Sequence, residues 1–203
     1  MNDDLNNILE KVQCLYLKYG IKSITMDDVA HELGISKKTL YTFVTDKTDL
    51  VKKILDKQLE EGKCYFDTIS NQTLNAIEEI IEVHKHVNNA IKKYNPTTEY
   101  DLRKYYPEIY KPFLEEKRKR MYSWILSNIK KGKSLGLYRD DVNENVISKL
   151  VVSRNEFLVE SDLFSENEFN SSDFFNEILK YHIRGVATTK GIELYESYLK
   201  ELK

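Results

Sequence analysis

The sequence predicts an all-α protein, in which an N-terminal three-helix head with a helix-turn-helix is joined by a long helix to a larger helical lobe. Apolar residues recur every three or four positions along most of the 203-residue chain, as they do on one face of a helix. Glycine and proline number only 7 and 3, whereas β-rich folds with many tight turns use far more. Charged residues reach 32%, as expected where many helices expose a polar face.

Three short helical segments predict the head. Residues 4–19 form an amphipathic pattern. Thr25 and Asp28 have the spacing of a capping box, in which a hydroxyl and a carboxylate each satisfy a free backbone amide at a helix start. Gly34 ends this second helix with a left-handed turn, and Ser36 is expected to cap a third short helix over residues 37–43.

A longer helix follows the head. Its apolar residues persist for more than five turns from Asp46, which is long enough to connect two lobes. We therefore divide the chain into a head, residues 1–46, and a helical domain, residues 47–203. Further helices are expected at residues 72–93, 108–131, 143–162 and 172–200, with a short irregular helix between Pro96 and Pro107 and a turn over residues 132–141.

Charge, cysteine use and hydropathy narrow the class of protein. The formal net charge is −2, so any nucleic-acid site must be local rather than a uniformly basic coat. Cys14 and Cys64 lack the spacing of a disulfide framework or a cysteine zinc site. An acidic start and the lack of an apolar run of membrane-spanning length argue against secretion and membrane insertion, so the protein is expected in the cytoplasm.

Residues 25–44 have the features that a helix-turn-helix needs. Ala30 is small enough for two helices to cross, and Gly34 suits the turn between them. The outward face of the following helix carries cations, hydroxyls and an aromatic ring without a carboxylate. Such a set can donate to guanine edges, touch a thymine methyl and bond phosphates. These residues are Ser36, Lys37, Lys38, Thr39, Tyr41 and Thr42.

Two helix starts are predicted to hold the DNA backbone. Lys47 lies in the first turn of the long helix, where the helix dipole disfavours a cation until a phosphate binds. Because free amides at helix starts bind anions, Lys47 and Thr25 can each clamp a phosphate. Residues 36–47 hold three lysines against one aspartate. In a chain of net charge −2, this is the local basic patch that nucleic-acid binding would need.

One pattern of residue types and spacing extends across the head. It consists of Tyr19-Gly20-Ile21, Ile24-Thr25-Met26-Asp27-Asp28-Val29-Ala30, Leu33-Gly34-Ile35-Ser36, Thr39-Leu40-Tyr41, Asp46-Lys47 and Leu50. Through it, about residues 5–52 resemble the N-terminal domain of the TetR family of bacterial transcription regulators. The resemblance implies that residues 37–43 are the recognition helix. It also implies that Lys37, Lys38, Thr39 and Tyr41 contact bases or phosphates, and that Thr25, Thr42 and Lys47 contact the backbone. Phe43 departs from the family, many of whose members place a polar group there, and Val44 stands where Phe is frequent.

The rest of the chain resembles the family only in its helical pattern, which implies a ligand pocket and a dimer interface. The family usually dimerises through its last two helices as a four-helix bundle. Here those segments carry wide apolar stripes with Gly185, Ala187 and Gly191, and close helix approach would explain glycines that each cost roughly 1 kcal/mol in a helix. The predicted interface, within residues 143–200, comprises Ile147, Leu150, Val151, Phe157, Ile178, Ile183 and Val186.

An apolar ligand cavity is predicted in the same lobe. Aromatic side chains supply apolar area with one polar tip, and a histidine and an asparagine would anchor a polar group of the ligand. The predicted lining residues are Tyr65, His84, Met121, Trp124 and Asn128. At helical spacing each of them also fits a plain core position, and this alternative stays open.

These features lead to one functional hypothesis and one alternative. The hypothesis is a homodimeric repressor whose two heads bind adjacent half-sites of a double-stranded DNA operator and which a small apolar inducer releases. The alternative is a ligand-independent architectural or division-control DNA-binding protein. An enzyme, a cofactor and a metal site are not predicted, because no catalytic constellation or phosphate loop is present and His84 and His86 point to different helix faces. The sequence does not distinguish a repressor from an activator.

Overall fold

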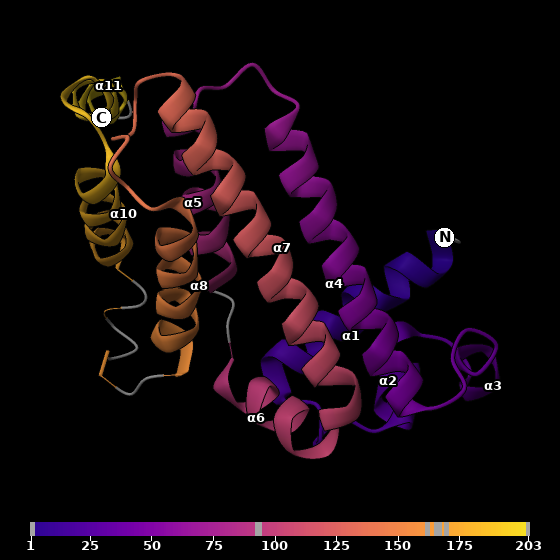
Figure 1. The fold of residues 1–203 in the computed structure, drawn as a ribbon. Coiled ribbons are helices and arrows are strands. Elements are labelled where there is room, and N and C mark those ends of the chain that lie inside the picture. The colour runs from indigo at the N-terminus through magenta and orange to yellow at the C-terminus, as the bar shows by residue number, and fades with distance from the viewer. Residues whose placement is uncertain (1–2, 92–94, 161–162, 165–167, 169–170, 202–203) are drawn as a thin grey trace. The chain divides into compact units, whose positions relative to one another are not determined.

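The computed structural model describes residues 3–91, 95–160, 163–164, 168 and 171–201, and confirms the predicted all-α class (Figure 1). In these ranges β-type backbone pairing is limited to one isolated bridge between Tyr138 and Ala187. The helices are α1 (Asp3–Tyr19), α2 (Met26–Leu33), α3 (Lys37–Leu40), α4 (Lys47–Ser70), α5 (Ala76–Ile91), α6 (Pro96–Tyr105), α7 (Pro107–Ser134), α8 (Glu144–Glu160), α10 (Ser172–Val186) and α11 (Thr189–Glu201). The predicted helix ends at residues 92–93 and 161–162 lie outside the described residues. No helix among the described residues has the length and apolar character needed to cross a membrane.

The chain forms two compact units, each with its own apolar core. The first unit comprises Met1–Gly62 and Lys93–Lys117, and the second comprises Lys63–Lys92 and Arg118–Lys203. Helices α4 and α7 each contribute residues to both units. The predicted boundary after residue 46 falls just before α4, inside the first unit, and the division into functional domains stays a prediction.

The core of the first unit binds the helix-turn-helix to the helices that follow it. Leu9 of α1, Val29 of α2, Leu40 of α3 and Leu50 of α4 are all fully buried in one cluster. Burial of such a side chain contributes about 1.5–3 kcal/mol. Each short helix of the head is therefore fixed by tertiary packing, which helices of four and eight residues need because they are too short to be stable alone.

Helix α6 is attached to the end of α1 by polar contacts inside the first unit. Asn95 Nδ2 donates to the Leu17 carbonyl at 2.7 Å, and Thr98 Oγ1 donates to the Tyr16 carbonyl at 2.7 Å. The bond from Asn95 gives the Leu17 carbonyl a partner at the helix end, where carbonyls lack intrahelical donors, and the bond from Thr98 adds a second donor to the Tyr16 carbonyl, which also accepts from the Gly20 amide. The buried Asp101 adds a third contact, because its carboxylate accepts from the Lys22 amide at 2.7 Å.

The core of the second unit contains a buried polar network. Asn128 Nδ2 donates to the Ala76 carbonyl and to the Glu79 carboxylate, at 2.9 Å each, and the Tyr138 hydroxyl donates to Asn128 Oδ1 at 3.1 Å. Lys131 Nζ completes the network by pairing with Glu79 at 2.6 Å. Every member has a partner, and a fully satisfied network of this kind specifies one packing of the helices around it.

The C-terminal segment differs from the prediction of one helix over residues 172–200. It forms two helices, α10 and α11, because Ala187 is extended (φ −80°, ψ 154°) and pairs with Tyr138. Thr188 then starts α11: its amide donates to the Leu137 carbonyl at 2.9 Å, and its hydroxyl accepts from the Gly191 amide at 3.2 Å. A contact with residues fifty positions earlier therefore breaks a segment whose periodicity is continuous in sequence.

Candidate nucleic-acid interface

The start of α2 has the predicted capping box. Thr25 Oγ1 accepts from the Asp28 amide at 3.1 Å, and the Asp28 carboxylate accepts from the Thr25 amide at 2.7 Å. The hydrogen bonds from Thr25 also lower the pKa of Asp28. At the other end, Gly34 adopts φ 67°, and the amide of Ile35 donates back to Ala30 at 3.1 Å. The turn between α2 and α3 is thus built by the residues that the sequence indicates.

Helix α3 is shorter than predicted but is capped as expected. Regular helix extends only over Lys37–Leu40, and residues 41–43 continue as turns. Ser36 Oγ accepts from the Thr39 amide at 3.0 Å and lies 2.7 Å from the Thr39 hydroxyl. Thr42 Oγ1 donates to the Thr39 carbonyl at 2.7 Å. These three hydroxyls are therefore engaged in holding the local backbone. One of the Ser36 and Thr39 hydroxyls keeps a hydrogen that it can donate, whereas Thr42 retains only acceptor lone pairs.

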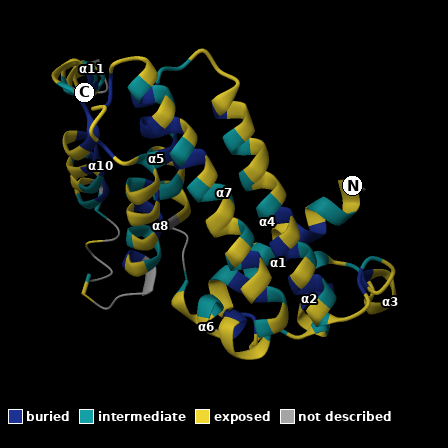
Figure 2. Cartoon of the chain, in the orientation of Figure 1, coloured by how far each residue is buried: buried dark blue, intermediate teal, exposed yellow. Residues whose placement is uncertain are grey.

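The cations and the aromatic ring of this segment face solvent (Figure 2). Lys37 Nζ forms an ion pair with Asp27 of α2 at 2.9 Å, with both side chains at least half exposed. Lys38 has no ion pair among the residues that the structure describes, and Tyr41 is 44% exposed. Lys38 and Tyr41 are thus available to a ligand directly, whereas Lys37 has to exchange Asp27 for a new partner.

Lys47 occupies a different environment at the start of α4. Its side chain is half-buried, and this burial lowers its pKa, against the opposing effect of Asp101 and Asp28. A phosphate bound at this helix start would compensate Lys47 for the hydration that it has lost. Its negative charge would also offset the ammonium group and the positive end of the helix dipole.

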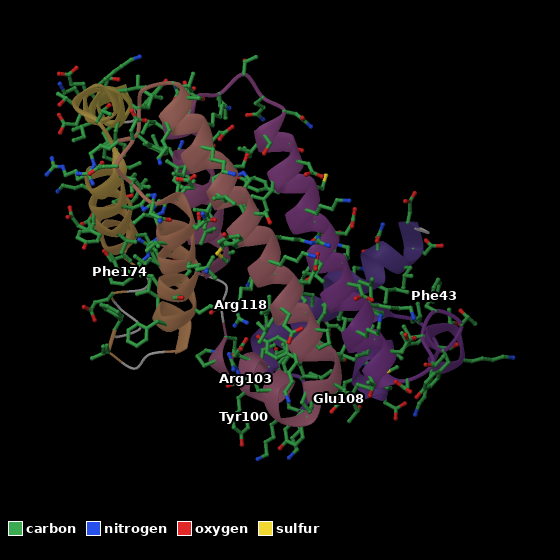
Figure 3. The ribbon with its side chains drawn as sticks, viewed as in Figure 1. Phe43, Tyr100, Arg103, Glu108, Arg118 and Phe174 are labelled. Carbon is green, nitrogen blue, oxygen red and sulfur yellow. The ribbon has the colours of Figure 1, made fainter. Side chains whose placement is uncertain are left out.

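Phe43, which departs from the family pattern, follows α3 at the edge of the head (Figure 3). It is half-buried and packs against the core of the first unit, and the next residue, Val44, is 3% exposed. Both residues therefore have a packing role here, which accounts for apolar side chains at these two positions.

The structure places the five predicted pocket residues in different surroundings. Trp124 is buried beside Phe66 with ring centroids 5.4 Å apart, and Asn128 is fully engaged in the core network. The Tyr65 hydroxyl donates to the Glu82 carbonyl at 3.0 Å. Met121 accepts from Asn155 at 3.6 Å. Of the five, His84 is the residue with a buried polar atom that lacks a partner, Nε2.

The seven predicted interface residues divide into two groups. Leu150 and Phe157 are 58% and 53% exposed, and Ile147 and Ile178 are half-buried. Val151, Ile183 and Val186 are at most 7% exposed because they belong to the core of the second unit, so they have almost no surface left for a partner. The sequence analysis missed two exposed apolar residues in the same helices, Val146 at 50% and Tyr181 at 80%.

Two basic residues that the sequence did not single out act electrostatically on the same region as His84, or lie close to it: they are Arg154 and His182. Arg154 of α8 and His182 of α10 lie in the second unit, and His182 is only 8% exposed. Burial and, to a smaller extent, the positive charge of Arg154 together lower the pKa of both His84 and His182 to about 4. No sequence signal identifies this group, because each residue stands alone within an ordinary amphipathic helix.

The chain is similar in sequence to HTH-type transcriptional regulators. No family model matches the chain. YvaF of Bacillus subtilis (strain 168), an HTH-type transcriptional regulator, is 31% identical over 85 residues, which is 41% of this chain and 45% of YvaF. The match therefore spans less than half of that relative.

Solved structures are similar over nearly the whole chain. A regulator of the TetR/AcrR family from Thermobifida fusca YX-ER1 has 17% identity and a TM-score of 0.61, covering 90% of this chain and 96% of that one. A gamma-butyrolactone receptor (ArpA-like protein) has 13% identity and a TM-score of 0.67, covering 99% and 98%. At these identities the likeness concerns the fold.

Proposed function

We propose that this chain, which has the fold of the TetR-family transcription regulators, is a dimeric DNA-binding repressor that a small, largely apolar molecule releases from its operator. The observation that carries the proposal is the open face of α3 and the turns after it. This face offers Lys37, Lys38 and Tyr41 to solvent while the buried Leu40 fixes it to the first unit. The match to YvaF, an HTH-type regulator, supports the same conclusion.

Two copies of this face would bind one operator. In helix-turn-helix dimers the recognition helices enter successive major grooves about 34–36 Å apart, so the operator has near-dyad symmetry. Lys37 would leave Asp27 for a base or a phosphate, and an exposed pair of this kind costs only about 0–1 kcal/mol to break. Lys47 at the start of α4 would neutralise a backbone phosphate.

A ligand in the second unit would act on this surface through α4. This helix begins directly after the helix-turn-helix at Lys47 and ends in the second unit at Ser70. A ligand that favours the conformation with weaker DNA binding by about 1–3 kcal/mol would lower operator affinity about 5- to 150-fold.

The test begins with selection of bound duplexes from a random library by the purified protein, followed by fluorescence anisotropy at two salt concentrations. We expect the selected duplexes to hold two half-sites related by a dyad. Lys37→Ala should reduce discrimination between the selected site and a mismatched site about 5- to 150-fold. Lys47→Ala should weaken binding to all duplexes and flatten the salt slope by about one unit.

Lys130→Ala is the matched control, because Lys130 is an exposed cation of α7 in the second unit. It should leave both the discrimination and the salt slope unchanged. Equal losses on every duplex from Lys37→Ala and Lys47→Ala would contradict the role of Lys37 in base recognition. Selected duplexes without paired half-sites would contradict the dimeric repressor.

Dimerisation is expected to depend on one exposed face of α8. Val146, Leu150 and Phe157 lie at positions i, i+4 and i+11 of this helix and are 50–58% exposed. Exposed apolar patches of this kind mark interaction surfaces. The double variant Leu150→Lys, Phe157→Lys should weaken the dimer at least about 100-fold, because it would bury two unpaired charges in the interface. Sedimentation equilibrium measures this change.

The control variant for this prediction is Leu135→Lys. Leu135 is also an exposed leucine, at 43%, but it lies after α7 and outside the predicted interface. This variant should keep the dimer intact. A double variant on α8 that sediments as the wild-type dimer would show that another surface joins the subunits.

A further inference from the structure

Among the residues of the second unit that the structure describes, three buried side-chain polar atoms lack hydrogen-bond partners. They are Nε2 of His84, Oδ1 of Asn88 and Nε of Arg154. His84 and Asn88 lie one turn apart on the same face of α5. Native proteins satisfy the great majority of such atoms, so each exception needs an explanation, and a ligand that the structure does not contain is one.

Arg154 is the most unusual of these groups. Arg154 is half-buried and its Nε is fully buried, yet among the described residues no carboxylate pairs with it, and its one hydrogen bond there is a long contact of 3.3 Å from Nη2 to Asn155. Withdrawing a charge from water without a counter-charge lowers stability. Residues kept at such a cost are typical of functional sites.

Arg154, His84 and His182 form one cluster, to which α8, α5 and α10 each contribute a residue. The charge of Arg154 acts on His84 of α5 and on His182 of α10, and the charge of His84 acts on His182, so the three groups lie within electrostatic reach of one another. The low pKa of both histidines, about 4, leaves them neutral at pH 7. Arg154 is then the one charge of this cluster, and its complement is a single negative charge.

The hydrogen-bonding capacity of the cluster restricts the chemical class of the ligand further. An interaction with the Phe175 backbone raises the pKa of His84 against the effect of burial, as a ring N–H directed at a carbonyl does, and the ring nitrogen without a partner is Nε2. In a neutral imidazole with one donating nitrogen, the other is an acceptor. The free oxygen of Asn88 is an acceptor as well. Both atoms therefore require a donor from the ligand, such as a hydroxyl group.

We infer that the cluster of Arg154, His84, Asn88 and His182 binds a small organic hydroxy acid. The guanidinium of Arg154 holds the carboxylate, since its planar N–H groups match the two oxygens. The hydroxyl of the acid donates to His84 Nε2 or Asn88 Oδ1. The small, largely apolar molecule of the proposed function would then carry one carboxylate and one hydroxyl group, and its effect on DNA rests on that function.

The binding test uses full-length protein without DNA and three probes of similar size: sodium lactate, sodium propionate and propane-1,2-diol, at equal ionic strength. Chemical shifts of the Arg154 Nε–H and of the two histidine rings report binding. We expect lactate to give a saturable shift with an affinity about fivefold above that of propionate, because one added hydrogen bond contributes about 1 kcal/mol. The diol should bind at least about tenfold more weakly than lactate.

The variant Arg154→Met separates a ligand site from a structural role. It should abolish the lactate response and raise the melting temperature of the free protein by a few degrees, because it removes a buried charge without a partner. Lys149→Met removes an exposed cation of the same helix and should leave lactate binding unchanged.

Four outcomes would overturn the inference. These are equal binding of the diol and lactate, equal binding of lactate and propionate, a lower melting temperature of Arg154→Met, and dissociation of its dimer, which would assign Arg154 to a subunit contact. Lactate binding that leaves operator affinity unchanged would keep the site and contradict only the proposed ligand response. The loss of site discrimination by Lys37→Ala remains a separate test of DNA recognition.

Discussion

Replacing Gly191 with alanine is expected to lower the free energy of unfolding by about 3 kcal/mol. A Cβ at this position of α11 would lie 2.2 Å from the carbonyl oxygen of Leu137 and 3.1 Å from the Cβ of Ala187. The carbonyl cannot move away cheaply, because it accepts the hydrogen bond from the Thr188 amide that starts α11. Urea denaturation of the variant and the wild type measures the difference.

Gly185→Ala is the matched control for this prediction. Gly185 lies inside α10, and none of the described residues comes within 4 Å of the position that its Cβ would occupy. Alanine has the higher helix propensity, so this variant should gain up to about 1 kcal/mol of stability in the monomeric state. If monomeric Gly185→Ala and Gly191→Ala lost equal stability, the contact with Leu137 would not be the cause.

The protein is also expected to lose stability as the pH falls from about 6.5 to about 4, through two histidines, one buried and one half-buried. Burial lowers the pKa of His84 and of His182 from 6.5 to about 4 in the folded state. Between these values the unfolded chain binds more protons than the folded one, so acid favours unfolding; above about pH 6.5 the histidines have no effect. His182, which is 8% exposed, should account for about 3 kcal/mol, and the half-buried His84 for less.

The histidine contribution is isolated by comparing variants rather than by acid unfolding alone, since carboxylates also titrate in this range. The free energy of unfolding of His182→Gln should fall by about 2 kcal/mol less than that of the wild type between pH 7 and pH 4.5. His31→Gln changes an exposed histidine of α2 and should follow the wild type. Parallel pH profiles for His182→Gln and the wild type would show that His182 is not held neutral in the fold.

The helix-turn-helix could be predicted in detail because short-range bonds build it. Thr25 bonds to Asp28, Ser36 bonds to Thr39, and Gly34 adopts the left-handed turn, so every determinant lies within a few residues of its partner. Spacing in the sequence is then nearly equivalent to spacing in the structure. The length of α3 was overestimated for the same reason, since the periodicity of residues 36–43 does not separate a helix from consecutive turns.

Residues of the larger lobe could be placed on helices but not assigned roles. An apolar stripe around a helix indicates burial without indicating what buries it. Ile183 and Val186 are therefore core residues, although Leu150 and Phe157 in the same predicted set face solvent. Asn128, a predicted pocket residue, bonds to Ala76, Glu79 and Tyr138 from distant parts of the chain, and its place in an amphipathic pattern gives no sign of these contacts.

By itself, the amino-acid sequence determined the all-α class, the capped helices of the head and the basic, hydroxyl-rich face after Ser36, because these depend on neighbours along the chain. Tertiary structure alone decided the break between α10 and α11, where Thr188 meets Leu137, and the isolation of Arg154 beside two buried histidines. Both features depend on which residues, remote in sequence, pack into the same core. The free-energy cost of burying a charge or a backbone amide arises only when that core has formed.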